Sequence, residues 1–301
     1  MRQLIVNADD LGLTAGVNRA IREAHTDGLV TSATLMATGA AFQDAIDLAG
    51  ALPSLSVGCH VVLVDGTPVC EHNFIPTLLS NRGSVPGHFH SRISAVAARA
   101  VFRRFDHDQL VTEIVAQVRK VQAAQVHVTH LDTHKHTHIF PQILQALVQA
   151  ARICGVPAVR NPFVPASSLR PRHFSRRPRL WKRYSQVRVL NSFATRFQSR
   201  MKRVGLATPD GVLGVIETGS FDTSLLRRAL TNLPDGTWEL VCHPGYDDSD
   251  LRASRTRLLA SREKELQLLK SPDLRQFLEE QSIRVIGYRE FAASNLSESE
   301  G

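Results

Sequence analysis

A short stretch of the chain, residues 130–138, holds four of the thirteen histidines together with an aspartate. The histidines stand at positions 130, 134, 136 and 138, and Asp132 lies between the first two. Neutral imidazole is the commonest metal ligand in proteins, and carboxylates often complete such sites. Scattered surface histidines rarely recur at this spacing beside an aspartate, so we predict a metal centre here rather than a solvated loop.

The histidine-rich stretch lies where a predicted strand gives way to a predicted helix. Residues 126–131 form an apolar, strand-like run, and residues 141–153 show the periodicity of a helix. In parallel α/β proteins such a junction falls at the carboxyl edge of the sheet, where active sites collect. The position therefore supports a functional reading of the cluster.

A pair of carboxylates marks the end of the first predicted strand. The apolar run at residues 2–6 is followed closely by Asp9 and Asp10. Adjacent carboxylates raise each other's pKa, and a bound cation or a role in a reaction usually explains such a pair. One of them could instead cap the helix expected at residues 15–27, but capping does not require two.

Two more histidines lie in, or directly after, predicted strands. His60 lies inside the apolar run 55–64, with Gly58 close by, and His243 directly follows the run 238–242. A lone histidine in an apolar strand is often a satisfied core residue, which is the alternative for His60. Because possible metal ligands also follow other predicted strands, a metal-ligand role is favoured for His60.

These strand ends together suggest a reaction class. Two histidines and one carboxylate form a three-ligand set that leaves an open coordination position, as in catalytic metal sites. A second aspartate can then act as a base, and a histidine from a fourth strand can act as an acid. We therefore predict metal-assisted hydrolysis of a carbonyl or phosphoryl centre.

The order of predicted elements indicates a mostly parallel α/β fold. A length of 301 residues suits one α/β barrel, and a hydrophobic content of 43% allows a full core. We expect an irregular segment at 65–105 and a loose polar tail at 293–301. Further strands are expected at 29–36, 158–160, 211–216 and 283–286, and further helices at 40–51, 108–123, 180–204, 223–230 and 252–269.

The positive charge of the chain is concentrated in one segment. Between residues 133 and 209 there are fifteen lysines and arginines and no acidic residue, although the whole chain carries only +8. The segment 162–205 reads as a basic insertion whose helix either packs on the core or lies on an anionic membrane. Nucleic-acid binding is a rival interpretation, but the segment has no known nucleic-acid motif.

Other features bear on the compartment. The four cysteines show no Cys-x-x-Cys spacing, so a cysteine metal site is not expected and the thiols suit a reducing environment. No apolar run is long enough to span a bilayer, and no secretory signal is visible. We expect a cytoplasmic protein, with membrane association as an added property of the basic helix.

Four motifs, taken in order, also resemble a known family. They are residues 7–12 (Asn-Ala-Asp-Asp-Leu-Gly), 58–60 (Gly-Cys-His), 130–138 and 242–246 (Cys-His-Pro-Gly-Tyr). The set looks like the YdjC family of carbohydrate deacetylases, which includes the ChbG type and the hopanoid-associated HpnK type. The resemblance covers nearly the whole chain apart from the basic insertion and the tail, and residues 65–69 look closer to the HpnK branch.

The resemblance implies a distorted (β/α) barrel, one divalent metal ion (Mg or Zn), and removal of acetyl from an N-acetylated sugar. Carried over by motif, Asp10, His60 and His134 would bind the metal, Asp9 would be the base, and His243 would lie in the active site. Lys135 stands where many members have histidine, and a protonated lysine cannot ligate a metal. Substrate-facing or supporting roles would fall to His130, Asp132, His136 and His138, and also to Arg160, which ends the predicted strand 158–160 and is a candidate anion or carbonyl contact.

The substrate implied is an N-acetylglucosamine-type oligosaccharide or a glycolipid such as a hopanoid glycoside. Hydrolysis of another amide or ester is an alternative, as is a protein with a vestigial site that binds nucleic acid or an anionic surface. The expected partners are the acetylated sugar, an anionic membrane through the basic helix, and a second copy of the chain in a homodimer. Nucleic acid is not expected.

Overall fold

The computed structural model describes the chain with gaps at several loops and at the C-terminus. The residues outside the description are 81–86, 166–180, 182–184, 186–187, 189–190, 216–217, 219–222, 255 and 300–301. Much of the predicted helix at 180–204 therefore lies outside the described residues. Among the described helices, none is both long enough and apolar enough to cross a membrane.

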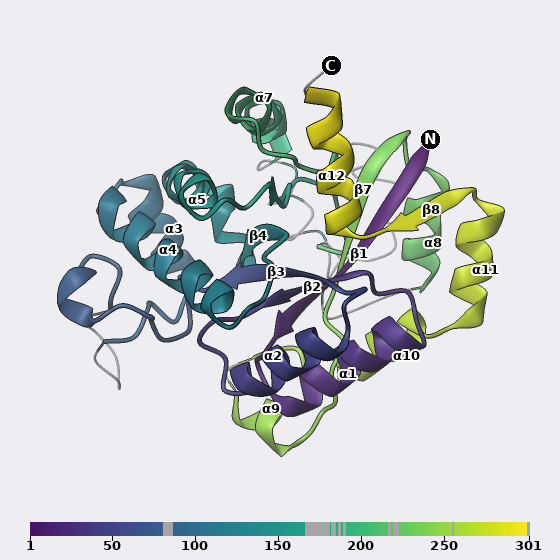
Figure 1. The fold of residues 1–301 in the computed structure, drawn as a ribbon, viewed down its shortest axis with the longest axis horizontal. Coiled ribbons are helices and arrows are strands. Elements are labelled where there is room, and N and C mark those ends of the chain that lie inside the picture. Colours follow the sequence, from purple (N-terminus) through teal and green to yellow (C-terminus); the bar gives the residue numbers. More distant parts are fainter. Residues whose placement is uncertain are drawn as a thin grey trace.

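Within the described part of the chain, eight strands form one sheet, and every pairing among these strands is parallel. Its order is β5-β4-β3-β2-β1-β7-β6, and β8 pairs with the first half of β1. The sheet curls into a half-barrel (Figure 1). The described residues show no ladder that joins β5 to β6 and would close it. The strands are β1 (Arg2–Leu11), β2 (Ser32–Leu35), β3 (Ser56–Val61), β4 (His130–Thr133), β5 (Ala158–Val159), β6 (Gly211–Leu213), β7 (Gly236–Cys242) and β8 (Ile283–Ile286).

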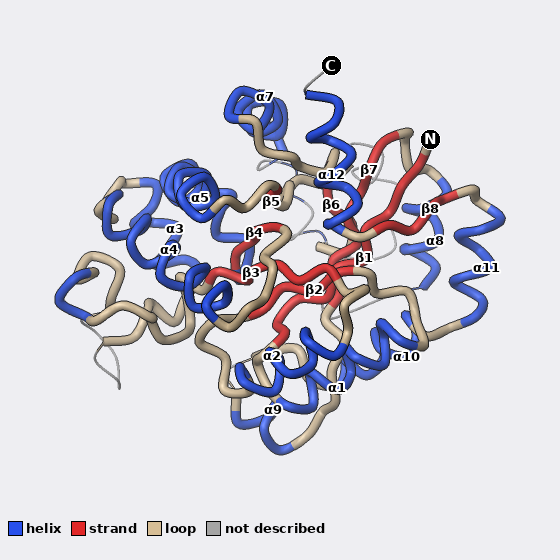
Figure 2. The backbone as a smooth tube through the Cα atoms, in the orientation of Figure 1, coloured by secondary structure: helices blue, strands red, loops and turns tan. Residues whose placement is uncertain are grey.

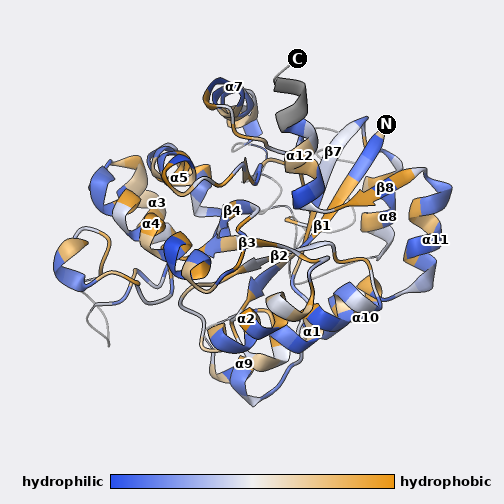
Figure 3. Cartoon of the chain, in the orientation of Figure 1, coloured by the Kyte–Doolittle hydropathy of each residue, from blue (hydrophilic) through white to orange (hydrophobic). Residues whose placement is uncertain are grey.

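Helices lie around the curled sheet (Figure 2). This explains why β1 carries a continuous apolar run, in which Leu4, Ile5 and Val6 are fully buried. Figure 3 shows orange, apolar segments along β1 and β8. The helices are α1 (Ala15–Thr26), α2 (Phe42–Ala51), α3 (Ile93–Val101), α4 (His107–Ala123), α5 (Pro141–Cys154), α7 (Ala194–Val204), α8 (Thr223–Thr231), α9 (Ser249–Ala253), α10 (Ala260–Leu269), α11 (Pro272–Glu280) and α12 (Tyr288–Ser299), with 3-10 turns η1 (His72–Phe74), η2 (His134–Ile139) and η5 (Asn191–Phe193).

The α/β barrel-like fold expected from the sequence is confirmed, with corrections to single elements. The fourth strand was placed too early, at 126–131. It begins only at His130, because Gln125 has a left-handed backbone (φ 62°) and the ladder to β3 starts at the pair Cys59–Leu131. The first strand is longer than expected and includes Asp9 and Asp10, which directly precede its last residue, Leu11.

Three further expectations were wrong in part. The segment 65–105 contains α3 and η1, and the segment 293–301 continues α12 as far as Ser299. The helix expected at 252–269 is two helices, because Leu259 departs from helical geometry (φ −110°, ψ −102°) between α9 and α10. This break matters for the site, since it sets the direction of α10.

The basic insertion is partly described, and its last helix packs on the protein. Phe197 and Met201 of α7 are buried, and the ring of Phe197 meets that of Phe163 edge to face at 5.6 Å. Phe193, just before α7, is 44% exposed. The packing interpretation therefore accounts for the inner face of α7, while contact of its basic face with a membrane stays a prediction.

Candidate metal and catalytic site

Three side chains from separate segments converge at the carboxyl edge of the sheet. They are Asp10 at the end of β1, His60 in β3 and His134 at the start of η2. Nε2 of His60 lies 3.6 Å from Oδ1 of Asp10, Nδ1 of His134 lies 3.3 Å from the same oxygen, and the two nitrogens are 3.2 Å apart. Ligand atoms placed about 2.0–2.2 Å from one ion are separated by similar distances. The three side chains named by the motifs thus form a candidate metal centre.

The other polar atoms of Asp10 and His60 are already occupied, which leaves Oδ1 of Asp10 and Nε2 of His60 for the ion. Oδ2 of Asp10 accepts a hydrogen bond from Arg262 at 2.5 Å, whereas its Oδ1 is buried and accepts none from the described residues. Nδ1 of His60 lies 2.8 Å from Oδ1 of Asp132. A carboxylate behind a ligating histidine fixes its tautomer and raises its basicity. An orphan carboxylate oxygen beside two imidazole nitrogens therefore fits a divalent cation.

The electrostatics of His60 point the same way. Burial lowers the pKa of His60, but the carboxylates of Asp132 and Asp9 outweigh it and raise the pKa to about 9. Without an ion this imidazole would carry a proton at neutral pH. A metal cation would take the place of that proton among the same carboxylates.

Asp9 is held differently from its neighbour. Both of its oxygens accept hydrogen bonds from Arg160, at 2.9 and 2.6 Å, and Asn7 donates a third at 3.0 Å. Burial raises the pKa of Asp9, but the Arg160 guanidinium and His60 more than offset it and hold the pKa well below its usual range. A second carboxylate–histidine group, Asp9, His60 and Asp132, is also close enough to hold an ion. Arg160 holds both oxygens of Asp9, whereas Oδ1 of Asp10 accepts no hydrogen bond from the described residues, so the set with Asp10 is the better site.

The helix after β1 does not use either aspartate as a cap. Thr14 is the N-cap of α1, and its hydroxyl accepts from the backbone N–H of Val17 at 3.2 Å. Asp10 instead has a left-handed backbone (φ 68°), at an irregularity in the ladder between β1 and β2. Strained conformations of this kind collect at functional sites. The capping alternative for the aspartate pair is therefore wrong.

Arg160 is an internal support and is not open to a substrate. Its side chain is fully buried, and besides Asp9 it pairs with Asp132 and with Glu239 of β7, the latter at 2.8 Å. The hydroxyl of Tyr288 donates to the other oxygen of Glu239 at 2.6 Å. The direct anion or carbonyl contact that the sequence suggested for Arg160 does not fit this burial.

His243 faces Asp9 from the end of β7. Its Nε2 lies 3.9 Å from Oδ2 of Asp9, and its Nδ1 lies 3.9 Å from Oε2 of Glu265 on α10. Glu265 also accepts the backbone N–H of His243 at 2.6 Å. Burial outweighs the nearby carboxylates and lowers the pKa of His243 to about 4, so the ring is neutral at neutral pH. A neutral imidazole beside a carboxylate is suited to proton transfer.

His130 lies beneath the site rather than in it. The ring stacks on Tyr288 at 3.6 Å, and its Nε2 lies 3.1 Å from Oδ1 of Asn7. The space for this ring depends on Gly58, since a Cβ there would lie 2.5 Å from the imidazole. His130 is thus a packing and orienting residue of the buried layer, and the glycine beside His60 is explained by it.

His136 and His138 do not join the ligand set. His138 is buried, and both its Nδ1 and its backbone N–H contact the hydroxyl of Thr133, at 2.7 and 3.0 Å. His136 is half-buried, and its Nδ1 is covered without a hydrogen bond from the described residues. Lys135, which directly precedes His136, pairs with Asp65 at 2.8 Å.

Several residues of the site were missed by sequence reasoning. Glu239 had a signal, because a charged residue inside the apolar run of β7 needs a buried partner. Arg262 and Glu265 had none, since they lie one helical turn apart on a helix that reads as an ordinary charged surface. Only the break before α10 turns this pair toward Asp10 and His243.

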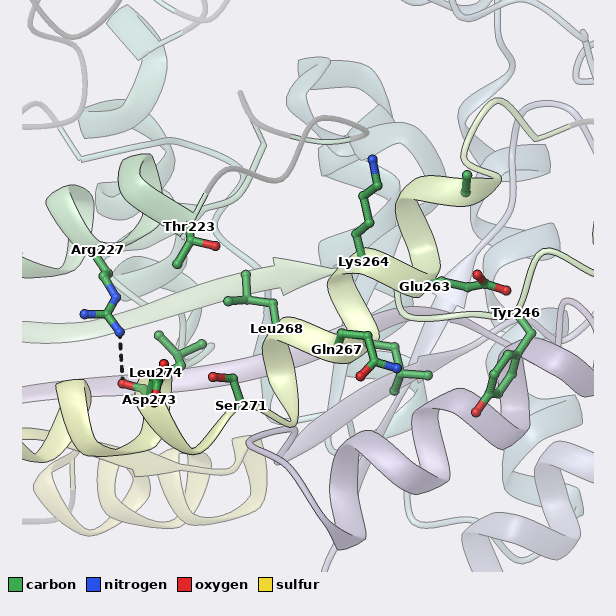
Figure 4. Close-up of a pocket in the computed structure, with 12 residues that line it drawn as sticks. Thr223, Arg227, Tyr246, Glu263, Lys264, Gln267, Leu268, Ser271, Asp273 and Leu274 are labelled. Atoms are coloured by element: carbon green, nitrogen blue, oxygen red, sulfur yellow. Dashed lines mark hydrogen bonds between the residues drawn. The ribbon is translucent and has the colours of Figure 1, made fainter.

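The opposite side of α10 borders a separate pocket of about 800 Å³ (Figure 4). Lys264 and Gln267 line it from α10, and Arg227 lines it from α8. Arg227 donates to the backbone carbonyl of Asp273 at 3.2 Å. The residues described as lining this pocket do not include the converging ligands, so it is distinct from the candidate metal centre.

Comparison with known proteins gives a family match along most of the chain. The family model for YdjC-like proteins matches residues 3–280. Relatives named carbohydrate deacetylase align over nearly the whole chain. Three of them come from Geobacillus stearothermophilus (32% identity over 291 residues, 96% of this chain and 98% of the relative), Brevibacillus brevis (29% over 289 residues, 96% and 99%) and Vibrio vulnificus strain CMCP6 (31% over 291 residues, 96% of each).

Among solved structures, one from Enterococcus faecalis V583 superposes with a TM-score of 0.73. It is described as a candidate cellobiose-phosphate cleavage protein, shares 22% identity, and is aligned over 96% of this chain and 98% of that chain. At this level of identity the likeness shows that the two chains share a fold.

Proposed function

Because the chain belongs to the YdjC-like family, we propose that it is a metal-dependent carbohydrate deacetylase that removes acetyl from an N-acetylated sugar. Relatives that align over 96% of the chain bear the name carbohydrate deacetylase. The observation that carries the metal dependence is the approach of His60 and His134 to the buried Oδ1 of Asp10, which accepts no hydrogen bond from the described part of the chain. Asp9 and His243 beside this centre supply the groups that hydrolysis needs.

A divalent ion bound by Asp10, His60 and His134 would polarise the acetyl carbonyl and make water a better nucleophile at neutral pH. The donor set, with two imidazoles and one carboxylate, is accepted by Zn²⁺ and is also compatible with Mg²⁺. Asp10 would offer Oδ1 alone, since Arg262 holds its other oxygen. Asp132 would keep His60 oriented throughout.

The two groups beside the centre can move a proton from the attacking water to the leaving amine. Asp9 is an anion in the resting site, so it can accept the proton of the water as the C–O bond forms. Its low pKa means that it does not retain this proton. His243 is neutral and its Nε2 lies 3.9 Å from Asp9, a distance of the kind that shortens when substrate binds.

Protonation of the leaving nitrogen completes the reaction. An amide anion does not depart at neutral pH, so the C–N bond breaks as His243 donates its newly gained proton to the nitrogen. Glu265, 3.9 Å from the other ring nitrogen, would stabilise the imidazolium that forms in between. The products are acetate and a free amino sugar.

For the substrate, we propose an N-acetylglucosamine-type oligosaccharide or a glycolipid that carries this sugar, such as a hopanoid glycoside. The basic face of the insertion, which includes Arg196, Arg200 and Arg203 of α7, would suit a glycolipid held at an anionic surface. Residues 65–69, which follow the His60 strand, resemble the hopanoid-associated HpnK branch of the family and support the glycolipid substrate.

The test is acetate release from N-acetylated glucosamine oligosaccharides and glycolipids by the purified protein. We expect release that stops when a chelator removes the ion and returns when Zn²⁺ or Mg²⁺ is added back. Release that persists at full rate after the protein has been stripped of metal would contradict the proposal. An absence of release from every N-acetylated sugar, with hydrolysis of another amide or ester, would point to a different hydrolase.

A further inference from the structure

The turn that carries His134 has an unfavourable local conformation. Lys135 (φ 55°, ψ 27°) and His136 (φ 52°, ψ 37°) are two consecutive non-glycine residues with left-handed backbones. Each costs free energy, because the Cβ atom approaches the following carbonyl group. The buried Nδ1 of His136, which lacks a hydrogen bond from the described residues, adds to this cost. Such a conformation persists only where surrounding contacts hold it.

One end of the turn is anchored by hydrogen bonds. The hydroxyl of Thr133 contacts both the backbone N–H and the Nδ1 of His138, at 3.0 and 2.7 Å. These contacts close the turn but do not reach its strained centre. The ion pair between Nζ of Lys135 and Oδ2 of Asp65, at 2.8 Å, does reach it.

Asp65 offers a fixed point because its loop is tied to α4 on both sides. Gln117 bonds to the backbone N–H and carbonyl of Val62, at 2.8 and 2.7 Å. Glu113 accepts the backbone N–H groups of Val69 and Cys70, at 2.9 and 3.0 Å. Both α4 side chains are fully buried. The loop between these anchors is therefore restrained, and it begins directly after the strand that bears His60.

We propose that the Lys135–Asp65 ion pair is a positioning clamp for the metal centre, which keeps the strained turn in place and so fixes His134 relative to His60. The inference rests on the metal centre of the proposed function. The clamp joins the segments that supply two of the three ligands. Lys135 does not ligate the ion, because a protonated amine has no free lone pair.

Replacing Lys135 with Met, or Asp65 with Asn, removes the clamp and leaves all three ligands intact. We expect the Kd for Zn²⁺, measured by competition with a chelator, to rise about tenfold in each variant, as for other groups that orient metal ligands. The double variant should be no weaker than either single variant, because both remove one interaction. Lys135→Arg retains the charge and should bind the ion nearly as tightly as the wild type.

A matched control is the pair between Lys270 and Glu23. Its atoms are 2.9 Å apart, and its side chains are 28% and 29% exposed, close to the 33% of Lys135. Lys270→Met should leave the Kd for Zn²⁺ unchanged. A merely structural ion pair would alter the melting temperature of the metal-free protein in both cases and the metal affinity in neither.

The outcomes separate the clamp from the proposed function. Wild-type metal affinity in Lys135→Met and Asp65→Asn would overturn the clamp, as would additive losses in the double variant. If the wild type binds Zn²⁺, Mg²⁺ or Mn²⁺ and the clamp variants bind it more weakly, the clamp stands even if no sugar is deacetylated. If the wild type binds none of these ions, the metal centre and the clamp are both wrong.

Discussion

Replacing Asp9 with Asn is expected to lower kcat by roughly 10²–10⁴-fold while the protein keeps its metal. The carboxylate at this position is an anion held by Arg160, and its amide counterpart cannot accept the proton of the attacking water. Metal content should be retained, because the ligand oxygen belongs to the neighbouring Asp10. Turnover is measured by acetate release with metal in excess, alongside metal analysis of the purified variant.

The control for this variant must disturb Arg160 without touching the reacting groups. Glu239→Gln does so, since Glu239 is the partner of Arg160 on β7 and burial raises its pKa to about 7. We expect Glu239→Gln to lose no more than about tenfold in kcat, in keeping with an orienting role. If Asp9→Asn turns over within tenfold of the wild type, Asp9 is not the base. If Asp9→Asn loses its metal, Asp9 is a ligand and the alternative set with Asp132 is favoured.

Replacing His243 with Ala should also lower kcat by roughly 10²–10⁴-fold on an N-acetyl sugar. The reason is specific to the leaving group, because an amine must be protonated as it departs. A 4-nitrophenyl acetate ester has a leaving group that departs as an anion. We therefore expect His243→Ala to slow hydrolysis of the ester by less than tenfold. The rates on the N-acetyl sugar and on the ester are measured with the same enzyme preparation.

The matched control is His127→Ala, which removes an exposed histidine in the loop before β4. It should hydrolyse both substrates like the wild type. An equal loss on the amide and on the ester in His243→Ala would show that His243 does not act as the acid. Normal turnover in both Asp9→Asn and His243→Ala would contradict the hydrolase interpretation of these strand ends.

Much of the fold and the ligand set could be predicted because both follow from local patterns. Apolar runs that contain His60 or are closely followed by Asp10 and His243 mark parallel strands, and parallel strands bring their carboxyl ends to one edge. The histidine-rich stretch after β4 then falls at the same edge. Physical placement brings these segments together, the family motifs single out Asp10, His60 and His134 among their side chains, and the structure places the three close together.

The supporting groups could not be predicted, because each depends on contacts between distant parts of the chain. Arg160 reads as an exposed strand end but is buried against three carboxylates. Arg262 lies 252 positions after Asp10 in the sequence. It reaches the Asp10 carboxylate only because the chain breaks between α9 and α10. Lys135 is a departure from the family motif whose partner, Asp65, is visible only once η2 and the loop after β3 are adjacent.

The central claim is that Asp10, His60 and His134 hold one divalent ion, and the most direct test is the metal content of His134→Ala. After purification and dialysis against Zn²⁺ buffered at the wild-type Kd, the metal content per chain is measured by elemental analysis. His136→Ala serves as the control, since His136 stands two residues further along the same turn and is not a ligand. We predict that His134→Ala retains well below the metal of the wild type, while His136→Ala retains the wild-type amount. Wild-type metal content in His134→Ala would contradict the account.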